Sequence, residues 1–325
     1  MDTLQQQIRT SRKIKDSSLK TYMCALKTLK NKIQPNGGML SGTDFLYDFN
    51  RTMNVINNEK TITSKKNKLT AILVALNSDT DKDTELIAKY SKELKQLNDE
   101  YLTFLKQQTK TDTQRINWLT YDELIGVLSS VVAEYDIHRI NQKDKLNRRE
   151  YDILQQLIIL FTYMEFPLRN DFADMRVVTK KQYANISANE QKRFNYLIIE
   201  QNGKKSFHIN QFKNQKAMGS KIYDVPTKLS KLMDIWLKHN KSEWYLTKSD
   251  RATPMNPNGI TKFLNKIFQR YTSKKISTSM LRHIIISHML KDTPTIAEVD
   301  AERQKIENLF LHSKGINELY RKVDD

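Results

Sequence analysis

The sequence predicts a mainly α-helical protein with one small β-sheet. Helix-breaking residues are rare, with 8 Gly and 6 Pro among 325 residues, whereas Leu, Lys, Gln, Glu and Ile are common. Those common residues favour helices, except that Ile is less favourable because it is β-branched. Residues 196–225 differ, because short β-rich runs there are separated by Gly203 and Gly219. Three strands are therefore expected inside a helical chain that is long enough for two domains.

The first part of the chain reads as four helices and a linker. Asp16 to Ser18 can cap a helix whose apolar residues recur every three or four positions, and this helix ends before Pro35. Further helices are predicted over residues 45–56, 63–76 and 85–108. Residues 110–115 lack an apolar anchor and read as a linker, so a domain boundary is expected between residues 112 and 113.

The second part is helical, then β-rich, then helical again. Thr120 followed by Asp122 and Glu123 is typical of a helix start. A strongly apolar helix over residues 149–165 is closed by Pro167. The predicted strands cover residues 196–199, 206–212 and 221–225. Helices resume after Pro226.

Charge indicates a polyanionic partner. The chain has 54 Lys and Arg against 37 Asp and Glu, a formal net charge of +17. Residues 1–68 hold thirteen of the basic residues and only five of the acidic ones. Such an excess favours binding to nucleic acid, because each neutralised phosphate releases condensed counterions. A basic protein without such a partner is the plainer alternative.

Several other classes are disfavoured. Cys24 is the only cysteine, which excludes an internal disulfide and a Cys-based zinc site. The start of the chain lacks a secretory signal, and the apolar stretch at residues 157–161 is too short to cross a bilayer. His283, His288 and His312 do not form a standard zinc motif. We expect an intracellular protein with a nucleic-acid partner and with no membrane segment, metal or cofactor.

Three short motifs contain residue types that suit attack on a phosphodiester. They are Pro-Leu-Arg-Asn-Asp at residues 167–171, Ser-Met-Leu-Arg-His at 279–283, and a segment from Leu311 to Tyr320 that contains His312. Tyr320 follows His312 by eight residues. A phenol oxygen can attack a phosphodiester when Arg and His side chains stabilise the charge on the phosphate oxygens.

In this order and spacing the motifs resemble the tyrosine recombinase or phage-type integrase family. The resemblance implies a helical core-binding domain at residues 1–112 and an α+β catalytic domain, with a small antiparallel β-sheet, at residues 113–325. It implies site-specific recombination of double-stranded DNA through a metal-free 3′-phosphotyrosyl intermediate, by a homotetramer on paired sites. The amino-acid sequences of the motifs look most like those of integrases of DNA viruses, virophages or related mobile elements.

The resemblance also assigns roles to individual residues. Tyr320 would be the nucleophile. Arg169 and Arg282 would be the two catalytic arginines, and His312 would donate to a nonbridging phosphate oxygen. Asp171 would be the orienting carboxylate, in preference to Asp174, because it lies one position from the common spacing and Asp174 lies two.

The remaining positions match less closely. Lys213 would protonate the leaving 5′ oxygen, with Lys216 and Lys221 as alternatives. Ser279 stands where relatives commonly carry His, and Leu311 stands where they carry Gly. A Ser hydroxyl can donate to a phosphate oxygen, but it is a poor general base.

Two rival functions stay open. A type IB topoisomerase shares the chemistry but relaxes supercoils as a monomer. A non-catalytic DNA-binding protein that retains the fold is favoured to some degree by Ser279 and Leu311.

Overall fold

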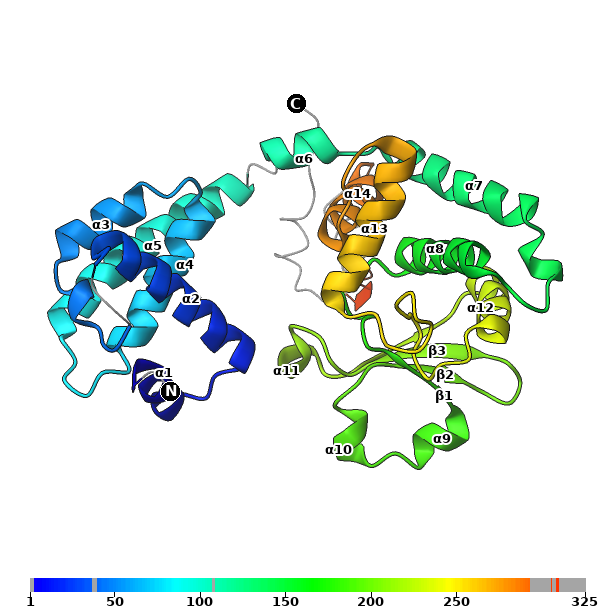
Figure 1. Ribbon diagram of the computed structural model, residues 1–325, viewed down its shortest axis with the longest axis horizontal. Coiled ribbons are helices and arrows are strands. Elements are labelled where there is room, and N and C mark those ends of the chain that lie inside the picture. Colours follow the sequence, from blue (N-terminus) through cyan, green and yellow to red (C-terminus); the bar gives the residue numbers. More distant parts are fainter. Residues whose placement is uncertain (1–2, 37–39, 107–108, 293–304, 306–307, 310–325) are drawn as a thin grey trace. The chain divides into compact units, whose positions relative to one another are not determined.

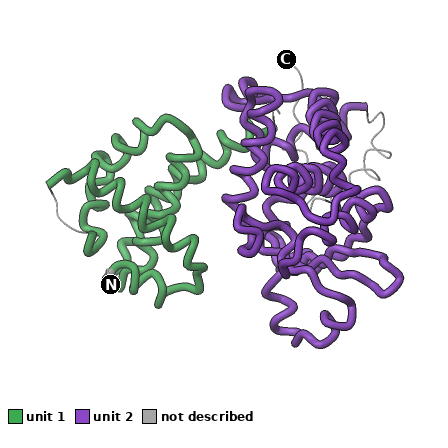
Figure 2. Tube along the Cα trace, turned by 45° about the vertical axis from the view of Figure 1, so that its right-hand side comes forward, with its two compact units in different colours: residues 1–107 green, residues 108–325 purple. Residues whose placement is uncertain are grey.

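The computed structural model describes residues 3–36, 40–106, 109–292, 305 and 308–309 (Figure 1). The chain divides into two compact units, residues 1–107 and residues 108–325 (Figure 2). The described part is mainly helical with a small sheet, as the composition predicts.

Unit 1 is helical throughout its described part. Its elements are α1 (Thr3–Ser11), α2 (Asp16–Ile33), a 3₁₀ turn (Asp44–Leu46), α3 (Phe49–Asn57), α4 (Ile62–Leu76) and α5 (Thr84–Lys106). The prediction of a single helix over residues 45–56 is wrong, because Asp48 separates the 3₁₀ turn from α3. The Asp48 carboxylate accepts the Arg51 N–H at 2.9 Å and caps the start of α3.

Unit 2 combines helices with the sheet. Its larger helices are α7 (Tyr121–Ile137), α8 (Arg148–Glu165), α12 (Thr227–His239), α13 (Pro257–Thr272) and α14 (Thr278–Leu290). Its shorter ones are α6 (Asp112–Asn117), a 3₁₀ turn (Ile140–Gln142), α9 (Lys180–Ala184), α10 (Ala188–Gln191) and α11 (Gln215–Met218). The predicted linker at residues 110–115 overlaps α6. A capping box between Thr111 and Gln114 forms this short helix, although it buries no side chain.

The sheet is mixed rather than antiparallel, which corrects the prediction. Its strands are β1 (Arg176–Thr179), β2 (Tyr196–Ile199), β3 (Lys205–Ile209) and β4 (Lys221–Asp224), in that spatial order. The β2–β3 and β3–β4 pairs are antiparallel, but β1 pairs with β2 in parallel. The segment between β1 and β2, with α9 and α10, carries the chain back to the end of the sheet where β1 begins. Both strands therefore run in the same direction.

Aromatic side chains join this sheet to α8, which lies over one of its faces in Figure 1. Phe207 at the centre of β3 makes edge contacts with Phe166, Phe172 and Tyr245, at ring-centroid distances of 5.1–5.6 Å. All four rings are buried. This core fixes the C-terminal end of α8, from which the chain turns out to Arg169.

None of the described helices combines the length and apolar character that a membrane span requires.

Candidate active site

The turn that follows α8 holds Arg169 by its backbone. The hydroxyl of the buried Tyr163 donates to the Arg169 carbonyl at 2.7 Å. The Arg169 N–H donates to the Asp171 carboxylate at 3.0 Å. Phe166 and Leu168 are buried on the inner side of the turn, whereas Arg169 is half-buried. The sequence pattern of an apolar helix closed by Pro167 therefore produces a rigid turn with an accessible arginine.

Arg282 reaches the same place from α14. Its side chain is only 1% exposed, and the apolar residues Leu281, Ile284 and Ile285 around it on α14 are buried in the core. Burial raises the pKa of Asp171, while the nearby charges of Arg282 and Arg169 oppose that rise. The structure thus brings together Arg169, Asp171 and Arg282, three of the residues predicted for the site. Asp174, by contrast, directs its N–H to the Met255 carbonyl at 3.2 Å.

A residue that sequence reasoning missed, Asn195, joins this turn to the β3–β4 connection. Asn195 is 5% exposed. Its amide N–H groups donate to the carbonyls of Asp171 (2.7 Å) and Gln211 (2.9 Å). Its amide oxygen accepts the backbone N–H groups of Asn210 (2.8 Å) and Gln211 (2.7 Å). One side chain therefore links Asp171 to the backbone two residues before Lys213. The only sequence signal is an amide directly ahead of an apolar strand.

The three candidate lysines all belong to the β3–β4 connection or its end. Lys213 and Lys216 are exposed, whereas Lys221 is half-buried and pairs with Ile209 in the sheet. Lys213 lies nearest in sequence to the backbone groups that Asn195 holds.

Ser279 lies in the first turn of α14, three residues before Arg282. Ser277 caps this helix by accepting the Met280 N–H at 3.2 Å. Ser279 is exposed, and it lies at the helix end that favours anions.

Tyr223 on β4 connects the site to the last described residues. Its hydroxyl donates to the Asn308 carbonyl at 2.5 Å, and Leu309 packs against the core of unit 2. Burial, followed by the charge of Asp171, raises the pKa of Tyr223, and Arg282 opposes this. Tyr223 was not among the predicted site residues. It lies near Asp171 and Arg282 and also contacts Asn308, in the segment that precedes His312. His312 and Tyr320 themselves lie outside the described residues.

Within the described residues, no three His, Cys, Asp or Glu side chains are grouped so that they could hold a metal ion.

Comparison with known proteins adds little. No protein-family model matches the chain, and no curated protein matches it either. Among solved structures, it is similar to one described as "Crystal structure of XerA recombinase", with 10% sequence identity and a TM-score of 0.40. That match covers 100% of this chain and 95% of the other. Because the similarity is slight, the assignment of function rests on the residues of this chain.

Proposed function

We propose that this protein is a tyrosine-type site-specific DNA recombinase. The observation that carries the proposal is the meeting of Arg169 and Arg282 at Asp171, the first from the turn after α8 and the second from α14. Two guanidinium groups beside one carboxylate suit a phosphodiester, since each can form paired hydrogen bonds to phosphate oxygens while the carboxylate orients them.

In the proposed reaction the Tyr320 hydroxyl releases its proton to water, and its oxygen attacks the scissile phosphorus. The bond from phosphorus to the 5′ oxygen breaks, and Lys213 gives that oxygen a proton. A 3′-phosphotyrosyl link is left on the protein. A 5′-hydroxyl from another duplex then attacks the link and releases Tyr320. Each step exchanges one phosphoester for another, so the cycle consumes no ATP.

The arginines have the largest electrostatic task. A tyrosine hydroxyl has an unperturbed pKa of about 10, so its oxygen needs help to act as a nucleophile near neutral pH. Arg169 and Arg282 stabilise the charge that develops on the phosphate, and His312 and the Ser279 hydroxyl donate to its oxygens.

The proposed partner is double-stranded DNA. The net charge of +17 supports it, as does the basic character of residues 1–68. We assign unit 1 to core binding and unit 2 to catalysis. Exchange between two duplexes needs one nucleophile for each strand that is cut, which favours a homotetramer on paired sites. The proposed setting is an integrating virus, virophage or related mobile element.

Selection of covalent adducts tests this without knowledge of the target. The full-length protein is incubated in EDTA with nicked duplexes of randomised sequence, which lose a short 5′-hydroxyl fragment on cleavage and so trap the intermediate. Adducts that survive denaturation are sequenced. We expect one enriched site, and pairs of that site should then recombine.

Each rival gives a different result. DNA binding without any adduct would identify a non-catalytic protein. Relaxation of plasmids that lack the enriched site would identify a topoisomerase. Adducts that require added magnesium would contradict the proposed chemistry.

A further inference from the structure

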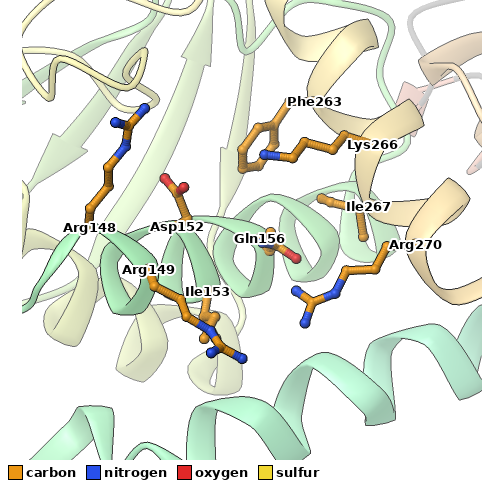
Figure 3. A pocket seen from close by; sticks show the side chains of 9 residues that line it. All are labelled: Arg148, Arg149, Asp152, Ile153, Gln156, Phe263, Lys266, Ile267 and Arg270. Carbon is orange, nitrogen blue, oxygen red and sulfur yellow. The ribbon is translucent and has the colours of Figure 1, made fainter.

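A basic cavity lies between the first turns of α8 and the middle of α13, and nothing in the proposed reaction uses it (Figure 3). It has a volume of about 350 Å³, within the range of roughly 300–1,000 Å³ that is usual for small-molecule sites. Ile153 and Ile267 are almost completely buried and form its apolar floor. On α8 the lining ends at Gln156, whereas Arg169 lies beyond the C-terminal end of this helix, at Glu165. The cavity is therefore separate from the proposed cleavage site.

Positive charge dominates the lining. Arg148, Arg149, Lys266 and Arg270 line the cavity, and Asp152 is the one acidic side chain among its described lining residues. Arg270 is neutralised by Glu134 at 2.6 Å. The other three cations form no salt bridge with any residue that the structure describes. In Figure 3 Lys266 reaches from α13 toward α8, while Arg148 and Arg149 extend in different directions from the first turn of α8.

Two of these cations stand where a helix disfavours them. Arg148 and Arg149 occupy the first turn of α8, at the positive end of the helix dipole. The neighbouring Asn147 and Glu150 form a capping box, in which each side chain accepts the backbone N–H of the other residue. The arginines are therefore not needed to cap this helix. A bound anion would compensate for this unfavourable placement.

The remaining lining suits a base. The ring of Phe263 is half-buried at the cavity and offers a surface for stacking. The side-chain oxygen of Gln156 is buried and lacks a hydrogen-bond partner within the described part of the chain. In Figure 3 this amide points toward the α13 side chains. An aromatic face and an amide are what a planar, hydrogen-bonding ring requires.

We propose that this cavity binds a nucleotide unit. Its phosphate would lie between Arg149 and Lys266, with Arg148 adding positive charge nearby, and its base would lie against Phe263 and Gln156. The unit can come from a free nucleotide or from a DNA strand, and both present the same chemistry. The proposal does not depend on DNA cleavage.

Calorimetric titration of the full-length protein tests the site. The probes are ATP, a six-residue thymidine oligonucleotide and inorganic phosphate, all at low salt. We expect binding of at least one nucleotide probe and much weaker binding of phosphate. Arg149→Glu and Lys266→Glu should each weaken it by about tenfold or more, because a phosphate contact is lost and a repulsion is added. Tighter binding of ATP would indicate a free nucleotide as the ligand, and tighter binding of the oligonucleotide would indicate a DNA strand.

Matched controls separate a binding site from general charge. Lys262→Glu makes the same charge change on an exposed residue of α13 outside the cavity, and should leave affinity nearly unchanged. Arg149→Glu should not lower the melting temperature, since an acidic residue suits the first turn of a helix. Nucleotide binding that is absent, that matches phosphate, or that Lys262→Glu weakens as much as Lys266→Glu would overturn the proposal.

Discussion

Replacing Asn195 by Ala would remove the side chain that joins the Arg169 turn to the β3–β4 connection. Four hydrogen bonds of 2.7–2.9 Å are lost. At about 1 kcal/mol for each bond, the free energy of unfolding should fall by about 4 kcal/mol. Asn240→Ala is a matched control, because Asn240 is buried to a similar degree and makes four hydrogen bonds of 2.7–3.4 Å in the 240–245 turn. Both variants should be destabilised, Asn240→Ala somewhat less because two of its bonds are longer.

Only the Asn195 variant should lose activity. Single-turnover cleavage, measured well below both melting temperatures, should slow by about 10- to 100-fold in Asn195→Ala, part of the roughly 10²–10⁴-fold that a positioned general acid supplies. Asn240→Ala should cleave at the wild-type rate. Equal rates in the two variants would refute the role of Asn195 as a positioning residue.

A sulfur-substituted substrate tests whether Asn195 acts on protonation of the leaving 5′ oxygen. When the leaving 5′ oxygen is replaced by sulfur, protonation matters little, because thiols have a pKa of about 8.5. The defects of Asn195→Ala and Lys213→Ala should then largely disappear, while Arg169→Ala should stay slow. If sulfur does not rescue Asn195→Ala, Asn195 does not act through the lysine.

The remaining predictions concern the two arginines, Ser279 and Asp171. Arg169→Ala and Arg282→Ala should each cost about 3 kcal/mol of transition-state stabilisation, roughly 10²-fold in single-turnover cleavage, with DNA binding retained. A near-normal rate would remove that arginine from the site. Ser279→Ala should slow cleavage by roughly 10- to 100-fold through loss of a hydrogen bond of about 1.5–3 kcal/mol, and Ser279→His should retain activity. An unchanged rate in the alanine variant would make Ser279 purely structural. Asp171→Asn should slow cleavage but raise the melting temperature at pH 7, because burial raises the pKa of Asp171 and the charged form costs stability. This gain should shrink as the pH falls and the wild-type carboxylate takes up its proton. A gain that grows toward low pH would contradict the direction of that pKa shift.

Local signals in the sequence predicted much of the architecture. The apolar run that ends at Pro167 corresponds to α8, which the structure buries, and Thr120 with Glu123 forms the expected cap of α7. Signals of this kind depend on neighbouring residues only, so a single sequence contains them.

Long-range contacts were not predictable in the same way. The parallel pairing of β1 with β2 depends on the path of residues 180–195, and a four-residue strand has little pattern of its own. Asn195 and Tyr223 act on carbonyls distant in sequence, and neither belongs to a recognisable motif. The meeting of Arg169 with Arg282 was expected only from the family resemblance, since spacing alone does not bring two helices together.

The central claim is that Tyr320 becomes covalently linked to DNA. The direct measurement is peptide mapping by mass spectrometry of the adduct trapped on the selected nicked duplex. We predict a 3′-phosphate ester on Tyr320 in the wild-type protein, and no adduct from Tyr320→Phe, which should still bind the same DNA. A link at another residue, or an adduct formed by the Phe variant, would contradict the account.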